Sequence, residues 1–541
     1  MSVVANEEAD IVIVGAGSAG CVLANRLSEN GRYRVALLEA GPRDRNFWIH
    51  LPIGYGKTMW DPRVNWQFET APEPTMNGRR IYWPRGRVLG GSSSINGLIA
   101  IRGQAEDYDG WRQLGNQGWG WEDVLPYFRK METAADFPDD PLHGTEGPLH
   151  ITRIPGTHPV IEAVIASAGR LGVPYTRDFN GARQEGVGYF TLTTHRGWRQ
   201  SSAVAYLRDA EKRPNVRVIC NAMATRVVFE GTRASAVDYR VHGVTHRLTA
   251  RRGIVMTAGA VQSPQLLMLS GVGPAAHLSE MGIPVLADIP GIGGNLQDHL
   301  QLRSIYRLNK HISTNDSLRS LIGRAGMGLQ WLLARKGPLA IGINQGSLFT
   351  RVLPESATPD IQFHIATLSA DMAGGKVHDF PGMTLSVCQL RPESTGTIRL
   401  ATPDPLAPPH IQANYLTAET DRRCMVAALK FTRRLAATAP LADLIESEYL
   451  PGPARVTDAD LLDFVRQAGA TIFHPSGTCR MGPLSETTSV VDPRLRMRGL
   501  GNLWVADCSI MPRLVSGNTN LPTIMIAEKA ADLIKEDIDH A

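Results

Sequence analysis

His474 has the side chain and the surroundings of a proton-transfer residue. It stands in the segment FHPSGTCRMG (residues 473–482), outside any helical apolar pattern. An imidazole titrates near pH ~6.5, so it can accept a hydroxyl proton at neutral pH. A lone histidine is more often a structural or surface group, and the residue type alone leaves both roles open.

Two asparagines near the C-terminus are candidates for holding a substrate oxygen. Asn518 and Asn520 lie in the segment SGNTNLP (516–522), just before an apolar helical pattern. A side-chain amide can donate a hydrogen bond to an oxygen on which negative charge develops. Asparagine also caps helices, and this is the structural alternative for Asn520.

A glycine-rich turn near the N-terminus has the spacing of a dinucleotide-binding motif. The β-branched run Ile11–Val14 predicts a buried strand, and three glycines follow it in the pattern G-x-G-x-x-G: Gly15, Gly17 and Gly20. The first glycine permits a tight turn, and the second lets backbone N–H groups approach a pyrophosphate. The third lets the following helix pack closely on the strand.

The elements after this turn complete the motif. Ser18–Ser28 has a helical pattern, and Val35–Leu38 predicts a second strand that ends in Glu39. Glu39 stands about 20 residues past the last glycine, where the motif places a carboxylate on the ribose. The order predicts a dinucleotide-binding βαβ unit, and its place near the N-terminus favours FAD over NAD.

Two further glycine-rich segments lie at residues 86–103 and 259–273. In the first, GGSS (90–93) offers a run of backbone donors that can wrap a phosphate or lie against a flat ring. In the second, a strand end is followed by Ser263-Pro264, which we expect to open a helix, and then by a glycine stop.

With these segments, the chain resembles the glucose–methanol–choline (GMC) oxidoreductase family, which uses FAD. The N-terminal fingerprint, the two later glycine-rich segments and the C-terminal His and Asn segments match in order, over essentially the whole chain. The likeness is greatest to the bacterial choline-dehydrogenase-like and aliphatic alcohol dehydrogenases. The resemblance implies an FAD domain around a parallel sheet and a substrate domain with an antiparallel sheet.

The resemblance also implies catalytic roles. His474 matches the family's catalytic base, and Asn518 matches the residue paired with it across the substrate oxygen. Asn520 is then assigned to the helix cap. Asp507 ends a strand, and we expect it to accept hydrogen bonds from ribityl hydroxyls or from local backbone.

FAD contacts are implied in several segments. Val227 matches the position that meets the adenine through its backbone, and Asn96 matches a residue near the isoalloxazine. The complete set of expected contacts is Gly15, Gly17, Ser18, Ala19, Gly20, Glu39, Ala40, Val88, Gly91, Asn96, Val227, Asp507 and Thr519.

Ile95 departs from one branch of the family. Some relatives attach FAD covalently through a histidine just before the residue that matches Asn96. This chain has isoleucine there, which cannot bond to the flavin. We therefore predict non-covalent, dissociable FAD.

The expected fold is α/β with an α+β second domain. A Rossmann-like FAD-binding domain is predicted in three parts, residues 1–153, 199–304 and 470–541, the last of which carries the catalytic His and Asn. An inserted substrate domain of antiparallel sheet plus helices fills residues 154–198 and 305–469.

The inserted region carries both strand and helix patterns. Strands are predicted at Ile361–Ile365, Met383–Leu390 and Thr397–Leu400, and Arg391–Gly396 is predicted as a hairpin loop between the last two. Leu318–Leu333 has a face rich in Met, Trp and Leu. We expect a core helix there, with contact to a membrane surface as the alternative.

The composition excludes several classes of protein. The 541 residues carry a formal net charge of +4 with the basic residues spread out, which argues against nucleic-acid binding. No apolar stretch approaches the ~18 residues of a transmembrane helix. No C-x-x-C pair and no secretory signal occur, so a reduced, cytoplasmic location is expected, with a peripheral place on the inner membrane as the alternative.

Metal binding finds little support in the sequence. His242 and His246 have H-x-x-x-H spacing but lack the Glu of H-E-x-x-H, and a hairpin turn around Gly243 is the expected structure. Asp298-His299 is a lone pair, and no cysteine set has ligand spacing, so no metal site is predicted.

The predicted reaction is FAD-dependent oxidation of a primary alcohol to an aldehyde. His474 takes the hydroxyl proton, Asn518 steadies the oxygen, and a hydride passes to flavin N5. A quinone-type acceptor is favoured over dioxygen. An uncharged alcohol is preferred over choline, because no clear aromatic cage for an ammonium group can be found among candidates such as Trp60, Trp66 and Phe473. Choline oxidation and a flavin-containing lyase of the same fold are the alternatives.

Overall fold

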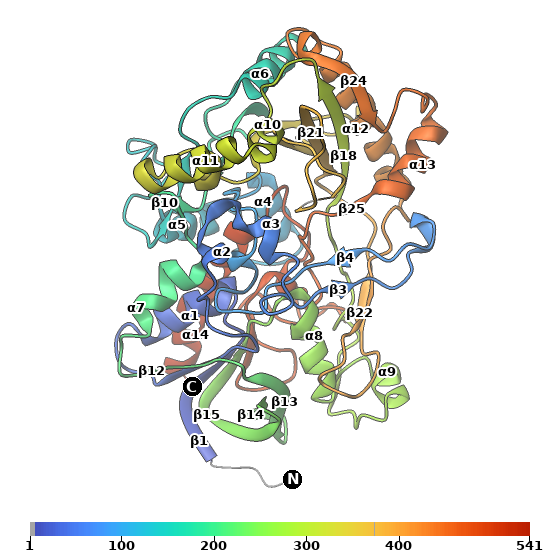
Figure 1. Cartoon of the computed structure of the whole chain (residues 1–541). Helices are drawn as coiled ribbons and strands as arrows, with labels where there is room; N and C mark the ends of the chain where they lie inside the picture. The colour runs from blue at the N-terminus through green and yellow to red at the C-terminus, as the bar shows by residue number, and fades with distance from the viewer. Residues whose placement is uncertain (1–5, 373, 541) are drawn as a thin grey trace.

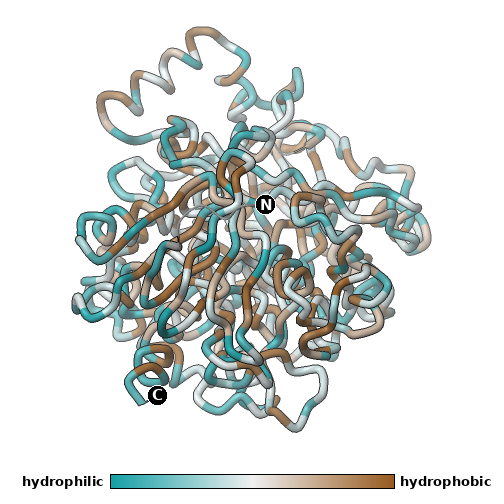
Figure 2. Tube along the Cα trace, turned by 90° about the horizontal axis from the view of Figure 1, so that it is seen from below, coloured by the Kyte–Doolittle hydropathy of each residue, from teal (hydrophilic) through white to brown (hydrophobic). Residues whose placement is uncertain are grey.

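The protein is built around two large β-sheets. The computed structural model describes residues 6–372 and 374–540. In the view of Figure 1 the first sheet lies in the lower part of the molecule and the second in the upper part, with helices packed around both. Apolar segments run through the middle of the molecule, and hydrophilic ones are common along its edge (Figure 2).

The first sheet combines a parallel core with an antiparallel extension. Its strands are β1 (Asn6–Val14), β2 (Val35–Leu38), β12 (Val216–Ile219), β13 (Met223–Glu230), β14 (Arg233–Val241), β15 (Val244–Met256) and β26 (Leu503–Val505). Strands β12, β2, β1 and β15 are parallel neighbours in that order, and β26 pairs in parallel with the end of β15. Strands β13 and β14 continue from the first half of β15 as an antiparallel meander. The β-branched residues Ile11–Val14 are buried between two parallel neighbours, as a central parallel strand requires.

The second sheet is antiparallel throughout. Its strands are β8 (Gly186–Tyr189), β18 (Leu300–Leu308), β19 (Asn344–Thr350), β20 (Ile361–Ala366), β21 (Gly382–Gln389), β24 (Ile445–Leu450) and β25 (Ala470–Thr471). The order is β24-β18-β21-β20-β19-β8, and β25 pairs with the start of β18. The sheet therefore assembles strands from distant parts of the chain.

The remaining elements are helices and short ladders. The helices are α1 (Ser18–Ser28), α2 (Phe47–His50), α3 (Tyr55–Thr58), α4 (Ala105–Gln113), α5 (Trp121–Met131), α6 (Pro159–Arg170), α7 (Arg208–Ala210), α8 (Gly259–Leu269), α9 (Ala275–Glu280), α10 (Thr314–Arg319), α11 (Leu321–Ala334), α12 (Glu419–Ala436), α13 (Asp458–Ala468) and α14 (Asn520–Asp539). Two-stranded ladders join β3 (Phe68–Glu69) to β4 (Tyr82–Trp83), β5 (Glu132–Thr133) to β6 (Leu149–His150), β7 (Thr152–Arg153) to β9 (Thr191–Leu192), β10 (Thr194–His195) to β11 (Trp198–Arg199), β16 (Val272–Gly273) to β17 (Ala287–Asp288), and β22 (Thr397–Arg399) to β23 (His410–Gln412).

The α/β fold expected from the sequence is confirmed, and two local details differ. The predicted hairpin at Arg391–Gly396 is wrong, because β21 pairs with β18 and β20, whereas β22 pairs with β23. A turn pattern shows where the chain changes direction, but it does not identify the partner strand. The junction predicted between residues 304 and 305 falls inside β18, all of which belongs to the second sheet.

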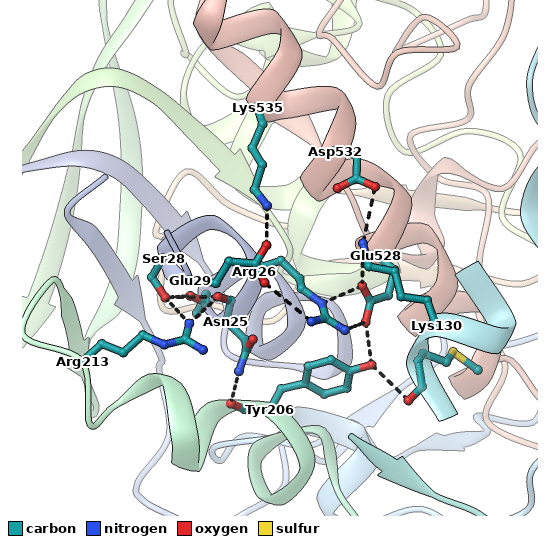
Figure 3. Close-up of polar contacts among 12 residues, drawn as sticks. Asn25, Arg26, Ser28, Glu29, Lys130, Tyr206, Arg213, Glu528, Asp532 and Lys535 are labelled. Atoms are coloured by element: carbon teal, nitrogen blue, oxygen red, sulfur yellow. Dashed lines mark hydrogen bonds and ion pairs between the residues drawn. The ribbon is translucent and has the colours of Figure 1, made fainter. Parts of the chain in front are cut away.

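A buried polar network joins α1 to α14 (Figure 3). The guanidinium of Arg26 on α1 donates two hydrogen bonds to the Glu528 carboxylate on α14, at 2.8 and 2.9 Å. The Tyr206 hydroxyl donates to the same carboxylate at 2.8 Å, and Lys130 Nζ lies 3.6 Å from it. The Glu528 side chain is completely buried. The network fixes two helices that are 502 residues apart in sequence against each other.

Helix α11 is not the core helix that its composition predicts. Met327 and Trp331 are buried, but five apolar side chains are exposed: Leu321, Ile322, Leu329, Leu332 and Leu333. Ile322 is 85% exposed and Leu333 is 76% exposed. The helix is apolar on nearly all sides, so its composition could not show which face is buried. None of the helices in the described ranges is long and apolar enough to cross a membrane.

Candidate active site

A cavity of about 670 Å³ is lined by residues from both sheets. The predicted dinucleotide contacts that line it are Gly15, Gly17, Ser18, Ala19, Glu39, Ala40, Gly91, Asn96, Asp507 and Thr519. His474 and Asn518 line it too, beside residues of β18, β20 and β21. One continuous space therefore reaches both the glycine fingerprint and the predicted catalytic pair.

The glycine fingerprint makes the close contacts that only glycine allows. Gly15 has a φ of +102°, and a Cβ there would lie 2.7 Å from the Thr257 carbonyl oxygen. A Cβ on Gly20 would lie 1.9 Å from the Gly15 carbonyl oxygen, so a side chain would push α1 off the turn. Gly91 approaches from another segment, and a Cβ on it would lie 2.6 Å from the Cα of Gly17. The two glycine-rich segments thus meet at the cavity.

Three helix N-termini border the cavity. Helices α1, α8 and α14 begin at Ser18, Gly259 and Asn520, all of which line it. None of the three has an acidic residue in its first turn, and α1 and α14 have no side-chain cap, whereas the first N–H of α8, that of Gly259, donates to the Asp507 carboxylate. Uncapped N–H groups and helix dipoles favour an anion, and a dinucleotide pyrophosphate fits this arrangement.

The start of two of these helices differs from expectation. Asn520 does not cap α14 but is its first residue, and its Oδ1 accepts a hydrogen bond from the Ser18 hydroxyl at 2.8 Å. Helix α8 begins at Gly259, before the Ser263-Pro264 step, so Pro264 lies inside its first two turns. Pro264 leaves the Ala260 carbonyl without its intrahelical donor, and the Thr478 hydroxyl donates to that carbonyl instead at 2.7 Å.

Glu39 ends β2 at the cavity, where the motif requires a carboxylate. Its Oε2 accepts from the Ala16 N–H at 3.0 Å, and its Oε1 accepts from the Gly41 N–H at 2.8 Å. Burial raises the pKa of Glu39 to about 7, although both N–H donors act to lower it. Carboxylate oxygens have further lone pairs, so this side chain can also accept ribose hydroxyls.

Asp507 is engaged by the backbone around it. Its Oδ2 accepts from the Gly259 N–H at 2.8 Å and from the Ser263 hydroxyl at 2.7 Å, and its Oδ1 accepts from the Ser509 N–H at 2.8 Å. Of the two roles predicted for this carboxylate, contact with local backbone is the one present here. Asp507 thereby holds the start of α8 in position at the cavity.

Asn96 and Ile95 lie side by side in the cavity wall. The Oδ1 atom of Asn96 accepts from Arg199 Nη1 at 2.7 Å and from the Leu98 N–H at 3.0 Å, which fixes its side chain. Ile95 contributes an apolar surface and is 6% exposed.

Three predicted contacts do not line the cavity. Gly20 packs beneath α1, and Val88 lies in an apolar cluster with Ile49, Val64 and Ile95. Val227 is fully buried in β13 and donates its N–H to the Ser270 hydroxyl at 2.8 Å. The segment 222–224 at the start of β13 lines the cavity instead.

His474 is held by contacts at its backbone and at both ring nitrogens. Its N–H donates to Asp298 Oδ1 at 2.8 Å, and Asp298 in turn accepts from the Tyr415 hydroxyl. Its Nδ1 lies 2.9 Å from His299 Nδ1, and its Nε2 lies 3.2 Å from Asn518 Nδ2. Burial, with the nearby His299, holds the pKa of His474 well below 6.5. The ring is therefore neutral at physiological pH.

The contacts of His299 determine which tautomer His474 adopts. His299 Nε2 lies 3.0 Å from the Leu390 carbonyl oxygen, which can only accept, so this nitrogen carries the proton. Burial lowers the pKa of His299 to about 4, which leaves its Nδ1 unprotonated. His474 Nδ1 must then donate to it. His474 Nε2 is left unprotonated at the cavity, with its lone pair toward Asn518 Nδ2 at 3.2 Å, and an unprotonated nitrogen is what a general base requires.

Asn518 is oriented by a residue of the second sheet. Gln362 on β20 donates from its Nε2 to Asn518 Oδ1 at 3.2 Å. With its oxygen occupied, the Asn518 amide presents Nδ2 to His474 Nε2 and to the cavity. An alcohol oxygen in the cavity within hydrogen-bond distance of both atoms would give its proton to His474 and accept a hydrogen bond from Asn518.

Four residues of this arrangement were not found by sequence reasoning. Asp298 and His299 were considered only as a metal pair, and Gln362 and His364 carried no motif. His364 lines the cavity, and its ring interacts with the Asn518 side chain without a direct hydrogen bond in the part of the chain that the structure describes. Alternation along β20 places Gln362 and His364 on one face, but only the pairing of the strands shows that this face meets Asn518.

One cluster has the composition of a metal site. Asp140, His143 and Asp178 hold their ligand atoms within 4.8 Å of one another. Both ring nitrogens of His143 bond to carboxylates, Nδ1 to Glu132 at 2.7 Å and Nε2 to Asp178 at 2.9 Å. Although burial opposes it, these bonds raise the pKa of His143 to about 9. The protonated ring offers no lone pair to a cation.

The chain matches known proteins along nearly its whole length. Residues 9–301 and 392–527 match the two profiles described as GMC oxidoreductase. The chain is 42% identical to an alcohol dehydrogenase [acceptor] of Pseudomonas putida, over 98% of this chain and 96% of that one. It is also 42% identical to the mitochondrial choline dehydrogenase of Mus musculus, over 98% of this chain and 90% of that one.

Solved structures show the same fold. Pyridoxine 4-oxidase from Mesorbium loti superposes with a TM-score of 0.87 and 31% identity, over 97% of this chain and 98% of that one. The glycine fingerprint, the cavity between the sheets and the matches along the sequence agree with one another, and the chain belongs to the GMC oxidoreductase family.

Proposed function

We propose that this protein is an FAD-dependent enzyme that oxidises a primary alcohol to an aldehyde, with His474 as the base. The observation that carries the proposal is the His474–Asn518 pair, in which a neutral Nε2 and an amide donor 3.2 Å apart face the cavity that also holds the glycine fingerprint. The relatives named as alcohol and choline dehydrogenases support the same reaction class.

The residues that line the cavity fit FAD. The two uncapped helix N-termini, of α1 and α14, would hold the pyrophosphate, Glu39 the ribose, and the segment around Asn96 the isoalloxazine. Bound FAD would supply the hydride acceptor. The chain itself supplies the orientation of the alcohol, the hydrogen bond from Asn518 and the acceptor for its proton at His474 Nε2.

We also propose that the FAD is non-covalent. The side chain before Asn96 is Ile95, which lines the cavity and carries no nucleophile. Release of FAD from acid-precipitated protein tests this proposal independently of the reaction.

The electron acceptor proposed here is a quinone at a membrane surface. The P. putida relative is named for an acceptor, and α11 borders the cavity through Arg324 and the buried Met327, while its apolar side chains on the outside are exposed. The segment 317–336 contains four basic residues and no acid: Arg319, Arg324, Arg335 and Lys336. Exposed leucines flanked by such charge fit an anionic lipid surface.

The proposal is tested by anaerobic reduction of the bound flavin with a panel of primary alcohols. We expect bleaching of the flavin absorbance in the wild type, and a rate roughly 10²- to 10⁴-fold lower in His474→Ala, the usual size of a general-base contribution. His277→Ala is the matched control, since His277 lies outside the cavity wall. Equal rates in His474→Ala and wild type would refute the assignment of the base.

Two other outcomes decide between the reaction classes. A yellow protein whose flavin no alcohol bleaches would favour a lyase of the same fold. Admission of air to the reduced enzyme then distinguishes the acceptors, because slow return of the colour supports the quinone and rapid return supports dioxygen.

A further inference from the structure

Arg303 is a cation in the cavity wall that lacks a counter-ion. It lies in β18, its Nη1 is shielded from solvent without a hydrogen-bond partner, and no side-chain contact of its guanidinium to a carboxylate occurs within the described ranges. The groups whose charge reaches it are the Tyr55 phenol, whose pKa is raised by burial, and Asp371, whose Oδ1 bonds to His378 Nε2 at 3.0 Å. A buried cation is costly unless an anion pairs with it. Its position therefore suggests that the anion arrives with a ligand.

The strand pairing locates Arg303 relative to the catalytic base. Arg303 pairs with Ser386 on β21, and Ser386 pairs with His364 on β20, so the three side chains form one row on the sheet face that lines the cavity. His299, which bonds to His474, stands four residues earlier in the chain than Arg303. The backbones of His299 and Arg303 are thus ~14 Å apart at 3.4 Å per strand residue, but on β20 the catalytic pair is closer to the row, since Gln362, two residues before His364, donates to Asn518.

The same row carries unused hydrogen-bonding groups beside the cation. His364 is 2% exposed, and its ring interacts with the Asn518 side chain but makes no direct hydrogen bond among the described residues. Burial lowers its pKa to about 3, so the ring is neutral and adds no repulsion toward Arg303. His364 and Ser386 can therefore donate to a polar group that Arg303 attracts.

The carboxylates of the cavity lie elsewhere. Among the described residues that line it, the acids are Glu39 and Asp507, and both are bound by backbone N–H groups beside the first sheet. At the second sheet the wall presents Arg303 and neutral polar groups. An ammonium substrate such as choline would meet a like charge there and no carboxylate.

We propose that Arg303 binds a carboxylate of the substrate, and that the substrate is a hydroxy acid whose carbinol lies at His474 and whose carboxylate lies in the Arg303 row. This inference rests on the proposed alcohol oxidation and names its substrate class. A planar guanidinium can hold a carboxylate through two parallel hydrogen bonds, which gives orientation as well as affinity. Arg303 is two strand spacings, ~10 Å, from His364, which lies at the Asn518 end of the row, so a chain of several carbons is needed between the two groups.

The test compares three alcohols of one chain length: 8-hydroxyoctanoate, 1-octanol and 8-amino-1-octanol. Anaerobic stopped-flow gives the second-order rate constant of flavin reduction for each. We expect the hydroxy acid to exceed the neutral alcohol by roughly 10- to 100-fold, the range expected of a charged hydrogen bond, with the amino alcohol slowest. Arg303→Met should lower the ratio of hydroxy acid to neutral alcohol by the same factor, and Arg303→Lys should keep part of it.

Arg307→Met is the matched control. Arg307 lies on the same strand, outside the cavity wall, with its guanidinium 4.4 Å from the centre of the Phe380 ring. It should leave the substrate ratio within threefold of wild type. Equal rates for the three alcohols in the wild type, or equal changes of the ratio in the Arg303 and Arg307 variants, would overturn the proposal.

Binding of octanoate separates this inference from the proposed function. Octanoate lacks the hydroxyl group, so its affinity for the oxidised holoenzyme, measured by equilibrium dialysis, reports the anion site without catalysis. We expect at least tenfold weaker binding to Arg303→Met than to Arg307→Met, and equal affinities would refute the site. If octanoate binding depends on Arg303 but no alcohol reduces the flavin, the anion site is supported and alcohol oxidation is refuted.

Discussion

His299 decides which nitrogen of His474 is free to accept a proton. Its Nε2 proton is held by the Leu390 carbonyl, so its Nδ1 is an acceptor and His474 Nδ1 must donate. In many catalytic sites a carboxylate or a backbone carbonyl accepts the hydrogen bond from the ring of the catalytic histidine. Here a second histidine accepts it. It orients the base without adding a negative charge, so the base stays weakly basic and neutral.

Removing that acceptor should slow the reaction without abolishing binding. For His299→Leu we expect flavin reduction about 10- to 100-fold slower, because either tautomer of His474 then becomes accessible. His299→Gln should recover much of the rate, since one amide can accept from His474 and donate to Leu390. Stopped-flow reduction rates measure both. Equal losses in the Leu and Gln variants would show that His299 serves packing rather than tautomer selection.

The pH dependence follows from the depressed pKa of His474. Because burial holds that pKa well below 6.5, the base stays unprotonated as the pH falls through 6.5. We expect kcat/KM for the alcohol to be flat from pH 8 to pH 6 and to fall only at more acidic pH. A midpoint at or above pH 6.5 would contradict this.

The stability of the folded chain changes with pH in the same direction and decreases as the pH falls. The unfolded chain protonates its histidines below pH ~6.5, whereas buried His299, with a pKa of about 4, stays neutral in the folded chain. The contribution of buried, neutral His299 to the free energy of unfolding is therefore fully present above pH 6.5 and is lost as the pH falls toward 4.

Because Ile95 cannot form a covalent bond to the flavin, we predict that the cofactor can be released intact. Trichloroacetic acid should precipitate a colourless protein and leave all the FAD absorbance in the supernatant. The substitution Ile95→His, at the position used for covalent attachment in some relatives, is the informative comparison. Yellow colour that stays with the precipitated wild-type protein would contradict non-covalent binding.

At the scale of elements, local patterns predicted the βαβ unit well, and long-range pairing explains what they missed. The strand at Ile11–Val14, the helix from Ser18 and the strand before Glu39 follow from residues that are adjacent in sequence. His299 and Gln362 reach the catalytic pair only through the register of β18, β21 and β20. Alternation reveals which residues share a face, but not which distant strand lies beside them.

Helix α11 was misjudged for a different reason. Its buried and exposed faces are both apolar, so periodicity carries no information on which face is covered. Gly323, Gly326 and Gly328 further weaken the pattern. A helix of this composition fits a core and a lipid surface equally well, and only the exposure of its leucines separates the two.

The membrane proposal is tested at this helix. We expect the holoenzyme to sediment with vesicles of phosphatidylglycerol and phosphatidylcholine, less with phosphatidylcholine alone, and less at high salt. The double variant Leu332→Gln/Leu333→Gln should reduce sedimentation about tenfold or more, because two exposed side chains no longer insert. Leu484→Gln, at a residue 56% exposed elsewhere on the surface, is the control. Equal sedimentation of all three proteins would refute docking through α11.

At the scale of the whole molecule, the Glu528 network ties the two ends of the chain together. Glu528 is completely buried and is satisfied by Arg26, Tyr206 and Lys130, which come from three other segments. A buried ion pair of this kind adds little net stability relative to apolar residues, but removing one partner leaves an unpaired charge. The network is thus more sensitive to a single substitution than to complete replacement.

Glu528→Ala should destabilise the holoenzyme strongly. We expect a loss of about 3–5 kcal/mol in the free energy of unfolding, because Arg26 and Tyr206 lose their buried acceptor and Arg26 keeps only the longer contact to Glu29 at 3.6 Å. Lys535→Ala on the same helix breaks a pair with Glu29 near the surface and should cost no more than about 1 kcal/mol. Urea unfolding followed by tryptophan fluorescence measures both variants. Similar losses in the two variants would show that the Arg26–Glu528 pair contributes no more to the free energy of unfolding than the Lys535–Glu29 pair.

The hydrogen bond between Ser18 and Asn520 has a consequence for biosynthesis. Its two residues are separated by 502 positions, and both line the cavity beside the helix N-termini that would hold the pyrophosphate. While the ribosome is still translating, α1 can form, but α14 has not yet emerged from the exit tunnel. The nascent chain therefore cannot close the pocket around its cofactor. FAD binding is then one of the last steps in maturation. A chain truncated before residue 518 would lack part of the pocket and could not retain FAD.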